Sequence, residues 1–507
     1  MIVLQHDFKK IIKVSRQGEP LAWNSNQSIG QKMYALAQKF PNEIITWSHI
    51  KVSEAINWEY CQKTVGSNRM MQSYNPFGNY MTDIIGYIEE SPFININKKV
   101  KYPTWQMSSV AGCMATNTII QTNQEFWKDS DFDYCLNGVA KAYQPLGLFC
   151  YSNPNLLKAP IELASPQASL GQTFRFVKQH YKAVWVYLLF LNLFLYERKI
   201  PLGSVLKTLF IHKKRTNQQA LIFNESEREA DYSIETIDVI IPTIGRKKYL
   251  YDVLCDLKVQ THLPIQVIVV EQNPLPDSKS ELDYIENEDW PFIIKHIFTH
   301  QSGACNARNI ALKEVKSKWV FLADDDIRFD TDLFQKVINK MYQYRISVLT
   351  TSCLQPNEIQ HYKMVHQSGI FGSGTSFVKT ISLSRVRFDK ALEFGYGEDT
   401  DFGLQLRNKG VDIIYVPDIV ITHLKAPMGG FRTKFVHPWE SDILQPKPSP
   451  TVLYVKNKFY SQSQILGYKT ILFLKLYKYQ IWKLYIFNRR WNSSKKWANS
   501  FKKNTTY

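Results

Sequence analysis

Three apolar runs between residues 237 and 323 alternate with segments that have the periodicity of amphipathic helices. The runs are Ile237–Pro242, Ile265–Val270 and Trp319–Ala323, and the helical segments are Lys247–Gln260 and Asn306–Val315. Apolar runs that alternate with helices are typical of parallel strands covered by helices on both faces. The pattern therefore predicts an α/β domain with a Rossmann-like, mostly parallel sheet.

Polar residues directly follow each of these three runs. Thr243 follows the first, Glu271 follows the second, and the triplet Asp324-Asp325-Asp326 follows the third. Ligands of such sheets bind at the carboxyl ends of the strands, where consecutive strand ends meet. The sequence predicts one site at this edge.

The acidic triplet indicates a cation. Three adjacent carboxylates repel one another, and a hard divalent cation such as Mg²⁺ or Mn²⁺ relieves that repulsion. The alternative is an acidic loop or the start of a helix, where carboxylates are also favourable. The position after a buried run favours the metal interpretation.

A second acidic pair, Glu398-Asp399, lies in the segment GYGEDTDFGLQLRNKG. The glycines around it permit a tight loop, and Asp401–Asn408 is expected to form a helix that ends before Gly410. A carboxylate at this position suits a general base that deprotonates a hydroxyl group. Alternatively, these acidic residues cap the helix.

These pieces together resemble the family 2 glycosyltransferases of the GT-A fold. The matching motifs are VIIPTIGR, VIVVEQNP, GACNARN, FLADDD, GSGTSFVK and GYGEDTDFGLQLRNKG, in the family's order over about 190 residues from Ile237 to His423. The resemblance implies metal-dependent, inverting transfer of a sugar from a nucleotide-diphosphate donor, a UDP-sugar by preference, to a glycan or lipid-linked acceptor.

The resemblance also implies which residues contact the donor. Those assigned to the nucleotide sugar are Pro242, Thr243, Arg246, Glu271, Arg308, Asp324 and Asp325. The second strand ends in Glu271-Gln272, whereas the family commonly has two aspartates there. The identity of the nucleotide therefore stays open.

The remaining assignments concern metal, base and loops. The resemblance implies that Asp324 and Asp326 hold Mn²⁺ or Mg²⁺, and that Asp399, beside Glu398, is the catalytic base. His423 follows a strand-like run and is either a third metal ligand or a structural histidine. Two further residues are assigned to loops over the acceptor or the phosphates: Gly374 and Arg432.

The first part of the chain resembles a degenerate copy of the second. Lys32–His49 parallels Arg308–Asp325, which puts Ser48 and His49 at the places of Asp324 and Asp325. Shared helix–strand periodicity also produces such matches by chance. The expected layout is a degenerate α/β domain at 1–223, a linker at 224–236, the GT-A domain at 237–446 and a basic aromatic helical tail at 447–507.

Composition adds an expectation about partners. The 62 Lys and Arg residues against 45 Asp and Glu residues give a net charge of +17, which attracts acidic partners. In the tail, Leu472, Phe473 and Leu474 lie among lysines, which favours peripheral contact with an anionic membrane over nucleic-acid binding. The alternative is a terminal helix packed on the core.

No apolar run reaches the roughly 18 residues that span a bilayer, and no signal peptide is recognisable. Seven scattered cysteines are typical of reduced thiols. We expect a cytoplasmic protein at the inner face of a bacterial cell membrane, acting in cell-surface polysaccharide synthesis. Two rival functions are a catalytically weak sugar-binding scaffold and a metal-dependent nucleotidyltransferase.

Overall fold

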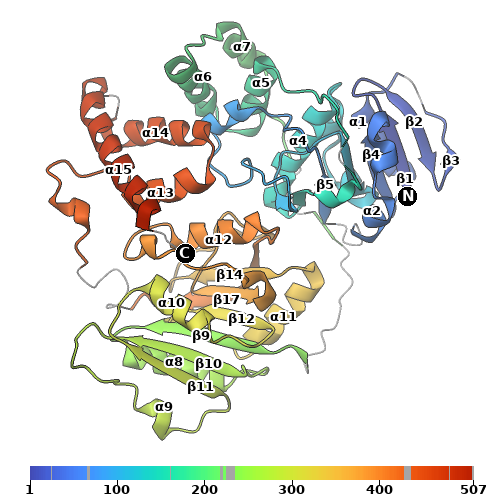
Figure 1. Cartoon of the computed structure of the whole chain (residues 1–507). Helices are drawn as coiled ribbons and strands as arrows, with labels where there is room; N and C mark the ends of the chain where they lie inside the picture. The colour runs from blue at the N-terminus through green and yellow to red at the C-terminus, as the bar shows by residue number, and fades with distance from the viewer. Residues whose placement is uncertain are drawn as a thin grey trace. The chain divides into compact units, whose positions relative to one another are not determined.

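The computed structural model describes residues 1–23, 26–64, 69–159, 161–216, 221–223, 234–426, 435–478 and 480–504. The chain divides into two compact units. The N-terminal unit comprises Met1–Glu225 with Tyr460–Leu476, and the C-terminal unit comprises Ser226–Phe459 with Tyr477–Tyr507. Each unit is built on its own mixed β-sheet (Figure 1).

The sheet of the C-terminal unit has the order β11-β10-β9-β12-β16-β14-β17-β13, with β15 paired to β17. Its strands are β9 Ile237–Thr243, β10 Gln266–Gln272, β11 Ile293–Thr299, β12 Trp319–Ala323, β13 Ile327–Phe329, β14 Val348–Leu354, β15 His366–Gln367, β16 Thr375–Lys379 and β17 Ile414–His423. The four strands from β11 to β12 are parallel, as predicted. Beyond them β14 and β17 also pair parallel with each other, and the antiparallel strands are β16, β13 and β15, so the sheet is mostly parallel as predicted.

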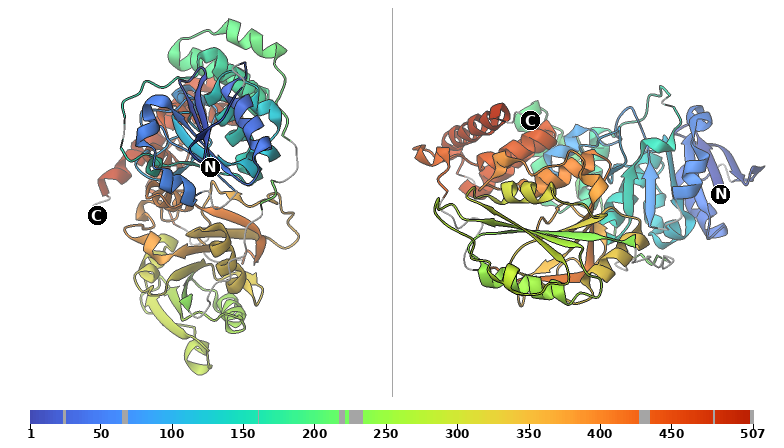
Figure 2. Two further views of the ribbon diagram at one scale, coloured as in Figure 1. Left: turned by 90° about the vertical axis from the view of Figure 1, so that its right-hand side faces the viewer. Right: turned by 60° about the horizontal axis from the view of Figure 1, so that its bottom comes forward.

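The helices of this unit are α8 Lys247–Lys258, α9 Tyr284–Asn287, α10 Ala304–Leu312, α11 Leu333–Tyr344, α12 Glu398–Asn408, α13 Pro450–Phe459 and α15 Leu484–Asn504. On one face of the sheet, Ile240 and Leu322 pack in a buried cluster with α10 and with Phe402 of α12. On the other face, Phe321 packs against Phe334 of α11. Figure 2 (right) shows this sheet between its helix layers, and the α/β fold class is confirmed.

The N-terminal unit also contains a mixed sheet, with the order β3-β2-β1-β4-β7-β5-β8-β6. Its strands are β1 Ile2–His6, β2 Ile11–Arg16, β3 Glu19–Pro20, β4 Ile44–His49, β5 Met70–Ser73, β6 Tyr102–Pro103, β7 Ala111–Ala115 and β8 Phe149–Ser152. Its helices are α1 Ile29–Lys39, α2 Trp58–Thr64, α3 Thr116–Gln121, α4 Phe132–Tyr143, α5 Leu170–His180, α6 Val184–Glu197 and α7 Leu202–Lys207.

Six strands of this sheet have counterparts in the C-terminal unit. In chain order, β1, β4, β5, β6, β7 and β8 have the same neighbours and directions as β9, β12, β14, β15, β16 and β17. The flanking strands differ, because β2 pairs antiparallel with β1 whereas β10 pairs parallel with β9.

The predicted tail is divided between the two units. Helix α14 (Gln462–Tyr477) packs in the N-terminal unit, where Thr470 donates a 2.6 Å hydrogen bond to Asn192 of α6. Helices α13 and α15 pack on each other in the C-terminal unit. Among the described residues, no helix combines the length and the apolar character that crossing a membrane requires.

Candidate active site

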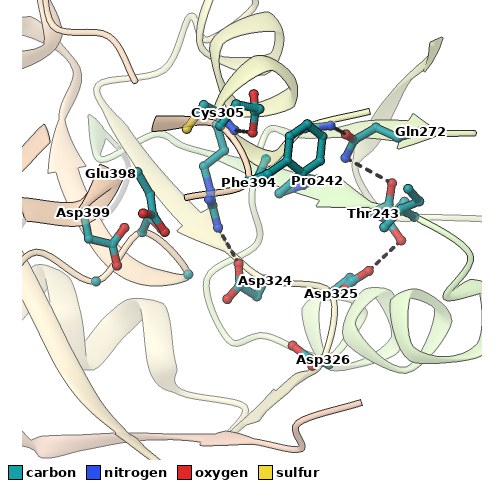
Figure 3. Close-up of a pocket in the computed structure, with 18 of the residues that line it drawn as sticks. Pro242, Thr243, Gln272, Cys305, Asp324, Asp325, Asp326, Phe394, Glu398 and Asp399 are labelled. Atoms are coloured by element: carbon teal, nitrogen blue, oxygen red, sulfur yellow. Dashed lines mark hydrogen bonds and ion pairs between the residues drawn. The ribbon is translucent and has the colours of Figure 1, made fainter. Parts of the chain in front are cut away.

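A cavity of about 540 Å³ lies at the carboxyl ends of β9 and β12 in the C-terminal unit (Figure 3). The residues assigned from the sequence that line it are Pro242, Thr243, Arg246, Arg308, Asp324, Asp325, Asp326, Gly374, Glu398, Asp399 and His423. They come from six separate segments of the chain. The sheet therefore brings Thr243 and the acidic triplet together, as the strand-end argument predicted.

Asp325 of the acidic triplet points toward β9. Its carboxylate accepts hydrogen bonds from the Thr243 hydroxyl at 2.6 Å and from the Arg246 guanidinium at 2.5 Å. Burial raises the pKa of Asp325 to about 6, although Arg246 and Thr243 act to lower it. Asp325 thus holds Arg246 in the wall of the cavity. Figure 3 shows Asp325 on the side of the cavity that Thr243 and Gln272 share.

Asp326 shares Arg246 with Asp325 and also reaches the end of β17. Its carboxylate lies 3.3 Å from His423 Nε2 and 3.1 Å from Arg246, and accepts a 2.9 Å hydrogen bond from the Ala426 amide. Burial alone would raise the pKa of Asp326, but the hydrogen bonds from His423 and Ala426 outweigh it and lower the pKa. The same contact raises the pKa of His423.

Asp324, Asp326 and His423 form a set that fits a divalent cation. One ligand atom from each lies within 4.8 Å of the others. Two carboxylate oxygens with one imidazole nitrogen suit Mn²⁺, and Mg²⁺ less well because it prefers oxygen alone. Three protein ligands leave coordination positions for substrate oxygens.

The charge balance of the cavity also favours a cation. The carboxylates that line it belong to Asp324, Asp325, Asp326, Glu393, Glu398 and Asp399. The basic side chains along the described part of its wall belong to Arg246, Arg308 and Lys425. The acidic groups outnumber the basic ones, so added positive charge stabilises the site.

Gly374 is required where β16 passes Asp324. A Cβ atom at Gly374 would lie 2.1 Å from Asp324 Oδ2, a distance at which the carboxylate would have to move. Arg308, from α10, donates a 2.8 Å hydrogen bond to the same carboxylate from the other side. Gly374 and Arg308 together fix where Asp324 points.

Asp399 lies in the first turn of α12, which begins one residue before it. Gly397 precedes the helix with φ +108°, a conformation that favours glycine, and so turns the chain sharply into the cavity. Within the described chain, Asp399 Oδ1 has no hydrogen-bond partner. Burial raises the pKa of Asp399 to about 6. It is therefore ionised at neutral pH, yet more basic than an exposed aspartate.

The neighbours of Asp399 have different surroundings. Burial also raises the pKa of Glu398, which lines the cavity beside it. Figure 3 shows both carboxylates across the cavity from Thr243 and Asp325, with Asp324 between. Asp401 instead forms a 2.6 Å ion pair with Lys458 of α13, and so helps to hold α12 in place.

The start of α10 contains a contact that the sequence did not reveal. Glu393 accepts hydrogen bonds from the amides of Cys305 and Asn306 at 2.9 and 2.8 Å. Gly303, with φ +139°, leaves room for it, because a Cβ atom there would lie 2.3 Å from the Glu393 carboxyl carbon. A carboxylate thus occupies the anion-binding end of the helix.

Among the described residues, one that was assigned to the donor site does not line the cavity. Glu271 faces away from it, and its carboxylate lies 2.9 Å from His296 of β11. Gln272 lines the wall instead and accepts a 2.6 Å hydrogen bond from the Gly303 amide, because neighbouring strand residues point to opposite faces. Arg432, with the glycines before it, lies outside the described residues.

Comparison with known proteins identifies the class of this domain. Residues 238–392 match the family model of glycosyl transferase family 2. This match covers the strands and helices that build the cavity up to Leu392. This region of the chain is thus a glycosyltransferase family 2 domain, and its predicted resemblance to that family is confirmed.

Two similar curated proteins each match a segment of comparable length. An uncharacterised glycosyltransferase of Rickettsia conorii is 28% identical over 145 residues, or 29% of this chain and 23% of the relative. A second, from Rickettsia felis, is 26% identical over 145 residues. The matched segment spans about a quarter of the length of these relatives.

Solved structures give weaker likenesses. A Staphylococcus aureus TarS fragment in complex with UDP-GlcNAc is 15% identical, with 52% of this chain and 81% of that chain covered and a TM-score of 0.36. A mannosyltransferase from Pyrobaculum calidifontis in complex with GDP-Man and Mn²⁺ is 16% identical, with 55% and 89% covered and a TM-score of 0.33.

Proposed function

We propose that the protein transfers a sugar from a nucleoside-diphosphate donor, with a UDP-sugar the first choice, to a hydroxyl of a glycan or lipid-linked acceptor. The observation that carries this proposal is the opposition of two groups in one cavity. A cation-binding set lies on one side, and a buried carboxylate with a free lone pair, Asp399, lies on the other. Both kinds of group promote direct displacement at a sugar carbon, one by taking up the acceptor proton and the other by stabilising the charge of the leaving group.

In this mechanism Asp399 accepts the proton of the acceptor hydroxyl as that oxygen attacks the anomeric carbon. The bond from this carbon to the diphosphate oxygen breaks, and the nucleoside diphosphate leaves with the electron pair. Attack opposite the leaving group inverts the configuration. A cation held by Asp324, Asp326 and His423 would supply positive charge to the diphosphate.

The donor's nucleoside end is assigned to the wall formed by β9 and β10. Thr243 and Gln272 offer hydroxyl and amide groups there, and Arg246 adds a guanidinium that is only 12% exposed. An arginine held rigidly by Asp325 suits recognition of a planar base or of a phosphate. Gly374 and Arg432 remain assigned to the loops that contact the acceptor or the phosphates.

We further propose that the N-terminal unit is a degenerate, catalytically silent copy of the domain. Its strand order supports a duplication, and by strand pairing the counterpart of the acidic triplet is Trp47-Ser48-His49, which carries no carboxylate. A Cβ atom at Gly112 of β7 would lie 2.2 Å from the ring of the buried Trp47. Gly374 has the same relation to Asp324 in the C-terminal unit. Strand pairing therefore favours Trp47, not Ser48, as the counterpart of Asp324.

We also propose that the protein contacts an anionic membrane peripherally, at the inner face of the cell membrane. The apolar side chains that support it are not those first assigned, because Leu472, Phe473 and Leu474 are half-buried. The exposed ones follow α14: Ile481, Trp482 and Tyr485 are at least 70% exposed, with Arg489 nearby. Exposed aromatic and basic side chains on one helix suit an anionic lipid surface.

The experiment that tests the function is hydrolysis of a panel of nucleotide sugars by the purified chain, with Mn²⁺ or with EDTA. We expect metal-dependent release of nucleoside diphosphate from one donor, loss of that release in Asp326→Ala, and normal release in Asp330→Ala. Asp330 is a matched acidic control, because its side chain is 82% exposed. Absence of both cleavage and donor binding would instead favour the sugar-binding scaffold.

A further inference from the structure

A second cavity, of about 620 Å³, lies within the N-terminal unit. Its walls come from the residues around the 3-10 helix η2 (Asp83–Tyr87), from the end of α6 and from the start of α14. All of these segments belong to one compact unit. The cavity is therefore separate from the acidic site of the C-terminal unit.

Neutral polar groups and apolar side chains share the lining of this cavity. Amides and hydroxyls are contributed by Asn79, Thr82, Gln167, Ser461, Gln462 and Ser463. Within the described chain, Asn79 Oδ1 and Thr82 Oγ1 are buried and have no hydrogen-bond partner. A buried polar atom without a partner is costly, so these two oxygens indicate that a ligand or water completes the site.

Thr82 is especially informative because its hydroxyl serves no structural purpose. It occupies the N-cap position of η2, where a threonine side chain normally accepts a hydrogen bond from the helix, but it makes no such bond. The hydroxyl is consequently available as both donor and acceptor. Groups that can do both match the hydroxyls of a sugar.

The charges of the lining disfavour a phosphate or a nucleotide. Lys199 is paired with Glu197 at 2.7 Å, and Asp83 adds a further carboxylate. The described wall thus carries no excess of positive charge to hold an anion. A neutral, hydroxyl-rich ligand is compatible with every group present.

The wall formed by the start of α14 is bound directly to the segment around η2. Gln464 of α14 donates hydrogen bonds of 3.0 and 3.1 Å to the carbonyls of Glu89 and Ser91. A Cβ atom at Gly467 would lie 2.2 Å from the Tyr87 carbonyl, so α14 approaches the η2 backbone as closely as glycine permits. Tyr87, whose ring stacks on Tyr196, completes a rigid polar wall with an aromatic component.

We propose that this cavity binds a neutral carbohydrate, and that this carbohydrate is part of the acceptor glycan. The identification of this carbohydrate as the acceptor rests on the function proposed above. Carbohydrate binding itself rests on the unpartnered oxygens, the neutral amide and hydroxyl lining and the aromatic wall. The N-terminal unit, silent in catalysis, then selects the acceptor.

Binding of the full-length chain to immobilised neutral and phosphate-bearing oligosaccharides tests this proposal, followed by titration of the best ligand in solution. We expect neutral oligosaccharides to bind at up to millimolar concentration. Thr82→Val, which keeps the shape of the side chain, and Asn79→Ala should each weaken binding about tenfold, as loss of one hydrogen bond does. Asn155→Ala, an exposed amide of the same unit outside the cavity, should leave it unchanged.

Hydrolysis of the nucleotide sugar, measured in parallel, separates this proposal from the function. Normal hydrolysis with unchanged glycan affinity in both cavity variants would overturn the carbohydrate site and leave the transferase intact. Binding to phosphate-bearing glycans alone, or to no glycan at all, would overturn it as well. If Thr82→Val lost glycan binding and even the unaltered chain cleaved no donor, the carbohydrate site would be supported and the transferase function would be overturned.

Discussion

Replacing Asp399 with asparagine should have opposite effects on activity and on stability. Burial raises the pKa of Asp399 from its ordinary value of 3.8 to about 6, so the ionised carboxylate destabilises the folded chain at neutral pH. At roughly 1.4 kcal/mol per pKa unit, this difference corresponds to about 3 kcal/mol. Asparagine has the same shape without the charge. We expect Asp399→Asn to be up to about 3 kcal/mol more stable at pH 8.

The sign of this effect depends on pH in a defined way. A raised carboxyl pKa means that the folded chain binds the proton more tightly than the unfolded chain does. The unfavourable contribution of Asp399 to stability therefore disappears as pH falls from above 6 to below 3.8. The advantage of Asp399→Asn should be full above pH 6 and should disappear near pH 4.

Transfer should respond in the opposite direction, because asparagine cannot accept the proton. We expect the rate of transfer to acceptor to fall by roughly 10²–10⁴. Urea unfolding at pH 8 and pH 4, in EDTA so that no cation offsets the charge, measures stability. Transfer is measured with Mn²⁺ and a donor identified by the hydrolysis panel.

Asp401→Asn is the matched control on the same helix. Asp401 is fully buried and forms a 2.6 Å ion pair with Lys458, which also lies 3.4 Å from Asp389. Burial raises the pKa of Asp401 and Lys458 acts to lower it, so we expect Asp401→Asn to gain less stability at pH 8 than Asp399→Asn. The reasoning about Asp399 would be refuted if Asp399→Asn transferred sugar normally, or if it were no more stable than the unaltered chain at pH 8.

Three further predictions concern the cation, the donor and the membrane. His423→Gln should weaken Mn²⁺ binding roughly tenfold or more, measured by the electron paramagnetic resonance of free Mn²⁺, and unchanged affinity would restrict the ligands to the carboxylates. Arg246→Lys should weaken nucleoside-diphosphate binding by about tenfold in calorimetry, because an ammonium cannot replace the planar guanidinium that Asp325 positions. Equal affinity would show that Arg246 does not contact the donor. Trp482→Glu should abolish flotation with vesicles containing anionic lipid but not affect donor hydrolysis, whereas persistent flotation would exclude this surface.

The strands around the site were predictable because burial on both faces leaves a strong local signal. The runs at 237–242 and 319–323 match β9 and β12 to within one residue. The start of α12 was predicted at Asp401 but lies at Glu398, because Gly397 turns the chain at positive φ before the helix. A glycine in a sequence does not show its own conformation.

Features that depend on distant contacts could not be predicted. The choice between Glu271 and Gln272 as a lining residue depends on where β10 ends, which its pairing with β11 decides. Glu393 reaches the start of α10 across 88 residues of sequence. Assignment of α14 to the N-terminal unit rests on pairs such as Asn192 with Thr470, which no local pattern reveals.

The central claim is that one cavity holds both a cation and the diphosphate of a sugar donor. Crystals grown with Mn²⁺ and a nucleoside diphosphate, measured at a wavelength where manganese scatters anomalously, test it most directly. We expect one manganese peak bound by Asp324, Asp326 and His423, with the diphosphate as a further ligand and Asp399 across the cavity. Nucleotide bound away from these residues, or manganese bound elsewhere on the chain, would contradict the account.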